Sequence, residues 1–374
     1  MSPRAATDLD ELLAARSDAN ARFFAAEAER IARLCRLMAE RFLDGGRLMA
    51  LGRSPTARSD ARHVAVEFVH PVIVGKRALP AIAQTAESGP ADLVVSPGDI
   101  VMAFDGPADA PGCLTIAFDE QAGAEWTFLP PTADPFVRQE LVETLYHVLW
   151  ELVHVFFEHT TTSAPVDAAS SFLYPFLAER HDDLDAVVED VRRSVLMKAE
   201  EVGALREQTL TENRHALRAA AADLRGAFAA GGTLLALGNG GSATDAMDVV
   251  ADLRAGGRRA LDLTEDTGII TAIANDIGTE AIFARQVIAL ARPSDVLLAL
   301  STSGNSPNVI AALAEARRRE LTTVAMVGYD GGRVAAEQLA DHVIVTRSEH
   351  IPRIQEAQAS AYHVLCELIE SHDT

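Results

Sequence analysis

The chain carries the same pattern twice, and this repeat constrains its fold more than any other feature of its 374 residues. Near the end of each half stands a helical segment with a shared motif, QELVETLYHVLWEL at 139–152 and QEAQASAYHVLCEL at 355–368. In both segments a glutamine precedes a histidine by eight residues. A glycine pair that ends a helical stretch also recurs, at 45–46 and 231–232. The sequence therefore predicts a duplicated domain.

We expect the two domains to span residues 1–160 and 183–374, each with a long N-terminal helix. Ser, Thr, Ala and Pro interrupt the periodicity of residues 161–182, which predicts a linker there. Apolar strands alternate with helical segments in the second domain, the order of a parallel sheet with helices on both faces. The predicted fold class is α/β, with two tandem flavodoxin-like domains of three layers. The predicted strands are 47–52, 99–104, 233–238, 259–263, 296–300, 322–327 and 342–345.

Composition and charge exclude several classes of partner. A formal net charge of −21 argues against nucleic acid and against anionic membranes, because both surfaces would repel the chain. No apolar run reaches the length of a membrane span, and the N-terminus lacks an apolar signal region. The three cysteines lie far apart, without metal-type spacing, so the expected compartment is the cytoplasm. A phosphorylated small molecule remains compatible, since local backbone N–H groups can hold it.

Two strand-to-helix junctions of the second half are rich in glycine and hydroxyl groups. They read GNGGSATDA at 238–246 and STSGNSPN at 301–308. In a parallel sheet both loops lie beyond the carboxyl ends of their strands, where ligands bind. Hydroxyl and backbone N–H groups at a helix N-terminus can surround a phosphate without lysine or arginine. Either loop alone could be a simple turn and helix cap. Two such loops on one sheet favour a phosphate site.

These segments resemble the sedoheptulose-7-phosphate (phosphoheptose) isomerases of the SIS-domain superfamily. The segments that carry the resemblance lie within roughly residues 190–370 and are GNGGSATDA, TAIANDIGTEAIFARQV, RPSDVLLALSTSGNSPNV and RIQEAQASAYHVLCELIE. The resemblance implies an aldose–ketose isomerase (an intramolecular oxidoreductase) of carbohydrate metabolism. The expected reaction converts sedoheptulose 7-phosphate to D-glycero-D-manno-heptose 7-phosphate. The positions that the resemblance implies for the sugar phosphate are Asn239, Gly240, Gly241, Ser242, Asn275, Asp276, Ser301, Thr302, Ser303 and Ser306.

The second half departs from the family in its acid–base positions. In the family a histidine and a glutamate, four residues apart, follow the glycine loop. A glutamine and a histidine eight residues apart on the last helix complete a set that can bind zinc. Here Asp248 and Asp252 stand at the first two positions, although Gln355 and His363 remain. A carboxylate is a harder ligand than imidazole, which puts family-type catalysis by this half in doubt.

The first half shows the opposite pattern. Its glycine loop has lost two glycines and STSGNS has no counterpart, yet the family spacing D-A-x-H-x-x-x-E returns at 60–67. His63, Glu67, Gln139 and His147 thus form a full set of family metal positions. The resemblance implies Glu67 and His147 as the acid–base pair and one Zn²⁺ per chain as the cofactor. The alternative is a surface i,i+4 pair at His63 and Glu67 and an ordinary helix residue at His147.

Active sites of the family lie between neighbouring subunits, which leads to the hypothesis of a composite site. In it the second half holds the phosphate and the first half supplies metal, base and acid. Two alternatives remain open. The chain could be a non-catalytic sugar-phosphate-binding SIS protein, a sensor or an interaction scaffold. Alternatively the first half only completes the oligomer, and Asp252 and His363 perform the chemistry. The resemblance also implies a homodimer, which would bring four SIS domains together.

Overall fold

The computed structural model describes residues 8–72, 76–86, 94–160 and 184–371, so the predicted linker 161–182 lies outside the described residues. The chain divides into two compact units. Ser17–Gly203 is called here the N-terminal unit, and Met1–Arg16 together with Ala204–Thr374 is the C-terminal unit. The domain boundaries expected from the sequence stay a prediction. No helix in the described part of the chain is long and apolar enough to cross a membrane.

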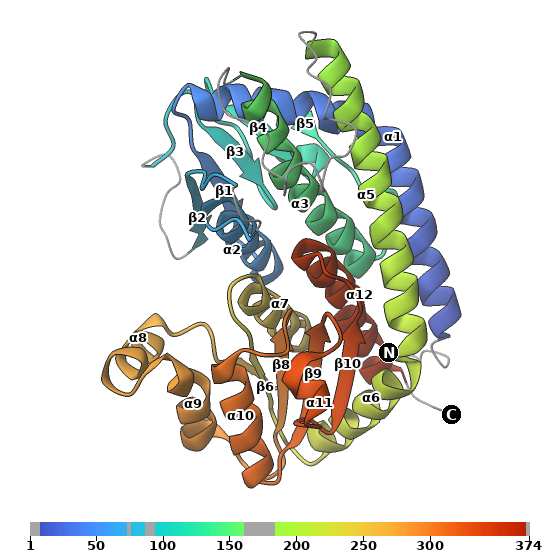
Figure 1. Ribbon diagram of the computed structural model, residues 1–374, viewed down its shortest axis with the longest axis vertical. Coiled ribbons are helices and arrows are strands. Elements are labelled where there is room, and N and C mark those ends of the chain that lie inside the picture. Colours follow the sequence, from blue (N-terminus) through green and yellow to red (C-terminus); the bar gives the residue numbers. More distant parts are fainter. Residues whose placement is uncertain (1–7, 73–75, 87–93, 161–183, 372–374) are drawn as a thin grey trace. The chain divides into compact units, whose positions relative to one another are not determined.

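The N-terminal unit holds a five-stranded parallel sheet in the order β2-β1-β3-β4-β5 (Figure 1). The three inner strands β1, β3 and β4 are short, apolar and almost wholly buried, whereas the edge strands β2 and β5 are only partly buried. The strands are β1 (Leu48–Gly52), β2 (Ala81–Thr85), β3 (Ile100–Ala103), β4 (Leu114–Ala117) and β5 (Trp126–Thr127). The helices that contribute to this unit are α1 (Leu9–Leu43), α2 (Pro55–Val69), α3 (Pro135–Thr160), α5 (Leu184–Glu212) and the short η3 (Glu120–Ala122).

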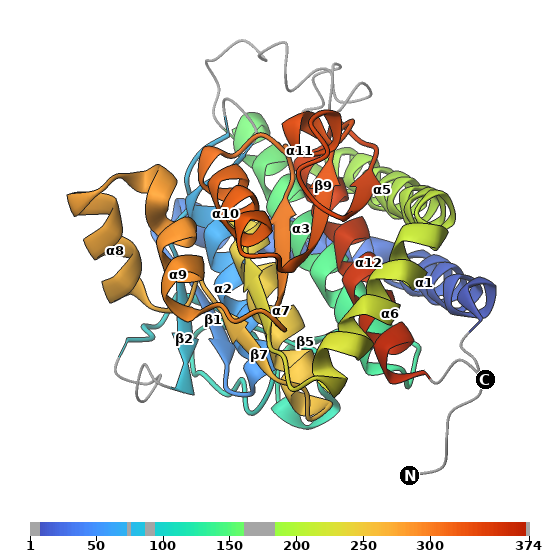
Figure 2. The same ribbon diagram turned by 90° about the horizontal axis from the view of Figure 1, so that it is seen from below.

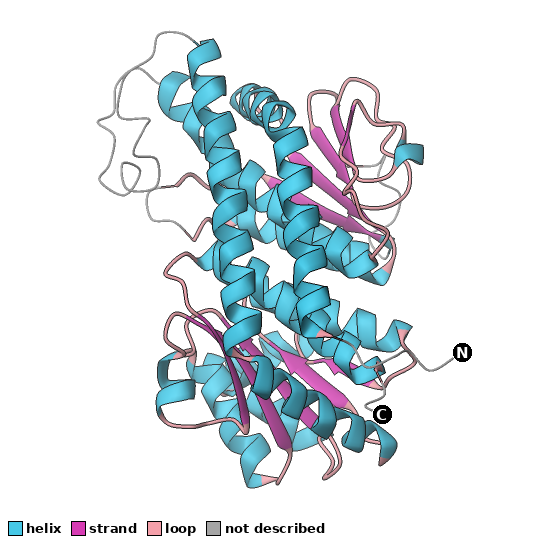
Figure 3. Ribbon diagram, turned by 90° about the vertical axis from the view of Figure 1, so that its right-hand side faces the viewer, coloured by secondary structure: helices cyan, strands magenta, loops and turns pink. Residues whose placement is uncertain are grey.

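The two faces of this sheet are covered differently. One apolar core joins side chains of α1, α2, α3 and α5 to alternate strand residues, among them Leu48, Ala50 and Ile100. On the other face lie loops and the short η3 (Figure 3). Residues 104–113, which connect β3 to β4, contain two prolines and two glycines and form no helix. The second face of this unit therefore has a much thinner cover than the first.

The C-terminal unit repeats the strand order of the first sheet. Its parallel sheet reads β10-β9-β8-β6-β7, which in chain order is the same 2-1-3-4-5 arrangement. This order is typical of flavodoxin-like folds and is what a duplicated domain would give. The strands are β6 (Leu234–Leu237), β7 (Ala260–Asp262), β8 (Val296–Ser301), β9 (Thr322–Gly328) and β10 (His342–Thr346). The predicted α/β class, with two parallel sheets and helices, is confirmed.

Helices cover both faces of the second sheet. On one side α9 and α10 enclose an apolar core with residues such as Leu235, Leu297 and Leu313, and α6, α7 and α12 pack together on the other. Helix α8 lies at the edge of the unit, and none of its residues is buried (Figures 1 and 2). The helices are α6 (Arg214–Ala229), α7 (Gly241–Ala255), α8 (Thr267–Asp276), η4 (Thr279–Ala281), α9 (Ile282–Leu290), α10 (Pro307–Arg318), α11 (Gly332–Ala336) and α12 (Ile351–Glu370).

Candidate functional site

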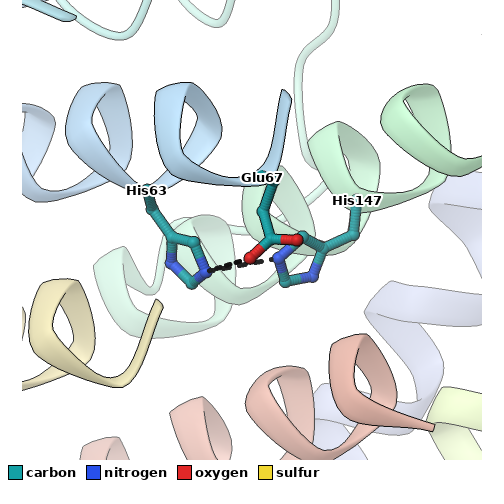
Figure 4. A group of neighbouring side chains, drawn as sticks. All are labelled: His63, Glu67 and His147. Carbon is teal, nitrogen blue, oxygen red and sulfur yellow. Dashed lines mark hydrogen bonds and ion pairs between the residues drawn. The ribbon is translucent and has the colours of Figure 1, made fainter. Parts of the chain in front are cut away.

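Two neighbouring helices of the N-terminal unit bring His63, Glu67 and His147 together (Figure 4). His63 and Glu67 lie one turn apart on α2, so they share a face of that helix, and His147 comes from α3. The Nε2 atoms of the two histidines are 3.3 Å apart, and His63 Nε2 lies 3.9 Å from Glu67 Oε1. All three side chains are buried, with at most 3% of their surface exposed. A solvent-exposed pair at His63 and Glu67 is thereby excluded.

The geometry of this His–Glu–His set suits a zinc ion. One ligand atom from each residue lies within 4.8 Å of the other two. Ligands held about 2.0 Å from a tetrahedral zinc ion are about 3.3 Å from one another, close to the observed separations. Two imidazoles and a carboxylate are donors that zinc accepts, and three protein ligands leave a fourth position for substrate. Gln139, the fourth predicted member, is also buried and stands two turns before His147 on α3.

Aromatic rings pack against the His–Glu–His set. The ring of Tyr146 lies 5.5 Å from that of His63 and 5.0 Å from that of His147, centroid to centroid. Tyr146 is the tyrosine of the YHVL motif. Because this motif occurs in both halves, the sequence could have predicted that the tyrosine lies beside the histidine of the site. Such packing fixes the orientation of the imidazoles and keeps bulk water away from them.

The corresponding positions of the C-terminal unit form a different cluster. Asp248 and Asp252 on α7 each place an Oδ2 atom 3.5 Å from His363 Nε2, which comes from α12. The hydroxyl of Tyr362, the second YHVL tyrosine, donates to Asp248 Oδ2 at 2.9 Å. Gln355 is buried on the same helix as His363. The structure thus brings together three of the four second-half positions that the sequence singled out.

Two carboxylates so close together in a buried place favour a bound proton. Burial raises the pKa of Asp252 to about 8, the neighbouring Asp248 carboxylate adds to the rise, and His363 opposes it. At neutral pH this cluster therefore holds a proton, whereas a metal would have to displace it. Asp248, Asp252 and His363 also meet the distance criterion for a metal site, but with two oxygen donors and one nitrogen. This donor set is harder than the His–Glu–His set of the N-terminal unit.

The loop after β8 has the shape of a phosphate cradle. Ser301 Oγ accepts the Gly304 N–H at 3.2 Å, and its hydroxyl lies 3.4 Å from that of Ser306. Gly304 has φ +61°, and a Cβ at this position would lie 2.2 Å from the Gly331 carbonyl oxygen, so only glycine fits. Ser306 is the N-cap of α10 and makes no side-chain capping bond, which leaves its hydroxyl directed to the loop.

The two glycine-rich loops lie side by side. Asn239, after β6, and Asn308, on the first turn of α10, exchange two amide hydrogen bonds of 3.0 and 2.9 Å. Gly240 leads into α7 with φ +58°, and Ser242 is buried in the first turn of that helix. The predicted loop residues of 239–242 and 301–306 are therefore assembled at one edge of one sheet. The sequence did not predict that Asn239 and Asn308 pair, because Asn308 at the start of a helix is typical of a capping residue.

Asn275 and Asp276 lie elsewhere on the C-terminal unit. They end α8, both side chains are exposed, and Asn275 Nδ2 donates to Asp276 Oδ1 at 2.7 Å. Among the described residues neither makes a hydrogen bond to the two glycine-rich loops. Their place in a sugar site stays a prediction.

The N-terminal unit has a carboxylate where its loops would meet an anion. The two oxygens of Asp105, in the loop after β3, accept the backbone N–H groups of Arg53 and Ser54 at 2.7 Å each. Arg53 and Ser54 form the loop after β1 and lead into α2, whose N-terminus favours a negative charge. The chain's own Asp105 thus satisfies the donors that a phosphate would otherwise use. The absence of a phosphate cradle in the first half stays a prediction.

Comparison with known proteins shows which family the C-terminal half resembles. A family model described as SIS domain matches residues 199–328. A phosphoheptose isomerase of Solidesulfovibrio magneticus is 40% identical over 190 residues, 49% of this chain and 92% of the relative. One from Trichlorobacter lovleyi is 47% identical over 149 residues, 38% of this chain and 75% of the relative. The chain belongs to the phosphoheptose isomerase family. These family members match the C-terminal half, and the N-terminal half is not covered by them.

Solved structures with little sequence identity share the fold over nearly the whole chain. The C-terminal domain of glucosamine-fructose-6-phosphate aminotransferase from Francisella tularensis matches 97% of this chain and 95% of its own, with TM-score 0.63 and 10% identity. Tagatose-6-phosphate ketose/aldose isomerase from Escherichia coli matches 100% of this chain and 99% of its own, with TM-score 0.51 and 13% identity. The phosphoheptose isomerase-like sequence is therefore one half of a chain whose fold extends through both halves.

Proposed function

We propose that this member of the phosphoheptose isomerase family is a sugar-phosphate isomerase that interconverts an aldose and a ketose. The most specific form of the proposal is the conversion of sedoheptulose 7-phosphate to D-glycero-D-manno-heptose 7-phosphate. The observation that carries it is the buried His63–Glu67–His147 set, in a chain whose other half has the family's phosphate loops. Supporting it, the second half is 40% identical to a phosphoheptose isomerase.

The chemistry asks for a base that moves a proton between two adjacent carbons through an enediol. Glu67 would remove the proton from one carbon and return it to the next. His147 would carry the accompanying proton between the two oxygens. His63, Glu67, Gln139 and His147 would hold one zinc ion, which when bound stabilises the negative charge that develops on oxygen. The exclusion of water by burial would strengthen these interactions.

We further propose a composite site, in which the two halves divide these tasks. Ser301, Thr302, Ser303 and Ser306 would hold the phosphate, and the first half would supply metal, base and acid. Two observations support the division. Asp105 accepts the backbone N–H groups of the loop after β1, and the C-terminal unit has two aspartates where the family has histidine and glutamate. Each half therefore keeps one part of the family's machinery and lacks the other.

One observation favours a second candidate, a sugar-phosphate-binding protein without turnover that acts as a sensor or scaffold. The half with the phosphate loops has the altered acid–base residues Asp248 and Asp252, as expected of a domain that binds but does not convert. On this reading the His–Glu–His set of the N-terminal unit would be structural.

Incubation of the purified full-length chain with sedoheptulose 7-phosphate, with and without added zinc, tests the proposal. We expect a heptose 7-phosphate product whose formation depends on zinc. Binding of the sugar phosphate without any product, in zinc-loaded protein, would support the sensor and contradict the enzyme.

We also propose a homodimer, which would assemble four SIS-type domains. Light scattering that shows a stable monomer would contradict it.

A further inference from the structure

A cavity at the amino edge of the C-terminal sheet is lined by four arginines. It has a volume of about 390 Å³, and Arg254, Arg258, Arg259 and Arg292 all contribute to its wall. Arg259 directly precedes β7, and Arg292 lies four residues before β8. The strands are parallel, so this edge is opposite to the glycine-rich loops, which follow the carboxyl ends of β6 and β8. A strand of six residues spans roughly 20 Å, which separates the two places.

The positive charges of this cavity are poorly balanced within the unit. Asp295 is the one acidic residue in its wall, and both carboxylate oxygens already accept backbone N–H groups, from Thr233 and Arg292, at 2.8 Å. Arg258 forms an ion pair of 2.9 Å with Glu370, which lies outside the wall. In the part of the chain that the structure describes, no hydrogen bond or ion pair engages the guanidinium groups of Arg259 and Arg292.

Such a gathering of cations is unexpected in a chain with 33 lysines and arginines against 54 aspartates and glutamates. Arg254, Arg259 and Arg292 are exposed, and Arg254 Nε donates to the Ala260 carbonyl oxygen at 2.9 Å. Water screens the mutual repulsion of these groups, and an anion among them would lower it further. The planar fork of arginine matches the oxygens of a phosphate group and can bind it through two parallel hydrogen bonds. Leucines complete the wall, so the cavity also offers an apolar surface to the rest of a ligand.

From this geometry we infer a second ligand site, separate from the phosphate loops, for a small molecule with a diphosphate group. The cavity is within the range of about 300–1,000 Å³ that small-molecule sites occupy. Two linked phosphates would spread three or four negative charges over the four arginines, which a single phosphate would do less well. The same group could come from inorganic diphosphate or from a nucleoside diphosphate, whose base would lie on the leucines. The site does not depend on the isomerase activity proposed above.

Isothermal titration of the full-length chain with inorganic diphosphate, at physiological salt, tests this site. The background variant is Ser303→Ala, which weakens binding at the phosphate loop. Adding Arg259→Ala and Arg292→Ala should lower the diphosphate affinity by roughly tenfold or more, because charge-assisted hydrogen bonds are lost. Arg285→Ala, which removes an exposed arginine from α9 outside the cavity, is the matched control and should leave the affinity unchanged.

Several results would overturn the site. They are the absence of diphosphate binding in the Ser303→Ala background, an affinity that the Arg259 and Arg292 changes do not alter, or an equal loss with Arg285→Ala. A parallel titration with ADP distinguishes the sources. Tighter binding of ADP than of diphosphate supports a nucleoside diphosphate, and equal affinities support recognition of the diphosphate group alone. Isomerase turnover of the Arg259→Ala, Arg292→Ala chain with an intact Ser303 should equal that of the wild type.

Discussion

His63, Glu67 and His147 are three buried ionisable side chains whose ligand atoms lie within 4.8 Å of one another. Burial of a charged or polar group is unfavourable unless a partner compensates it, and a metal ion is such a partner. The three side chains already contact one another, and their donor atoms are of the kinds that zinc accepts.

Metal analysis of the purified protein should find one zinc ion per chain. His63→Ala should lower that content to near zero, because it removes one of the few ligands of the ion. His70→Ala is a fitting control, since His70 is exposed at the end of the same helix. Zinc retained in full by His63→Ala would contradict the assignment of this set as the metal site.

In the phosphate loop, Ser303→Ala should weaken substrate binding more than it slows the chemical step. One hydrogen bond to a charged group contributes about 1.5–3 kcal/mol, so we expect KM to rise by roughly 10- to 100-fold. Steady-state kinetics would show this as a large change in KM with a small change in kcat. An unchanged KM would contradict the assignment of Ser303 to the phosphate site.

The Asp252 carboxyl predicts a pH dependence of stability. With the pKa of Asp252 raised to about 8, the folded chain keeps a proton that an unfolded aspartate releases near its ordinary pKa of 3.8. The free energy of unfolding should therefore fall as the pH rises from about 5 to 8, by on the order of 1 kcal/mol per pH unit. Chemical denaturation of chelator-treated protein would measure it. Asp252→Asn should flatten this dependence, and an equally steep fall in that variant would show that another group causes it.

At the scale of elements, Asp105 joins the loop after β3 to the loop after β1. Asp105→Asn removes the charge at the N-terminus of α2 and one of the two acceptor oxygens. We expect the N-terminal unit to lose about 1–3 kcal/mol of stability, measured by chemical denaturation. Asp109→Asn, at an exposed position of the same loop, should change stability by less than about 0.5 kcal/mol. Equal effects of the two substitutions would mean that the Asp105 contacts do not stabilise the loop.

The five strands of the C-terminal sheet, two strands of the N-terminal sheet and the paired Gln and His positions could be predicted from the sequence, because they depend on local pattern and on the repeat. Strands β2, β4 and β5 of the N-terminal sheet were not predicted. Predicted strand 296–300 became β8 (Val296–Ser301), and His147 and His363 both lie in buried clusters. Contacts between distant residues could not be predicted in the same way. The Tyr362–Asp248 and Asp105–Arg53 bonds join loops or helices that have no shared pattern in the sequence. The prolines of residues 104–113 are visible in the sequence. That they leave one face of the first sheet with a thin cover became clear only from the structure.

At the scale of the whole chain, the two sheets have the same strand order, and the proposed function gives their units different parts of one reaction. The N-terminal unit has the His–Glu–His set, and its Asp105 carboxylate accepts the backbone N–H groups of the loop after β1. The C-terminal unit has the two glycine-rich loops and an Asp252 carboxyl whose pKa burial raises. The proposed division of labour makes both halves necessary for one reaction.

Turnover of sedoheptulose 7-phosphate by Glu67→Gln and by Asp252→Asn, with the wild type beside them, tests this division most directly. Glu67→Gln should lower kcat by about 10²-fold or more, because it removes the proposed base, while sugar-phosphate affinity stays within a few-fold. Asp252→Asn should keep most of the activity. Full activity of Glu67→Gln together with loss of activity in Asp252→Asn would place the chemistry in the C-terminal half and contradict the composite site.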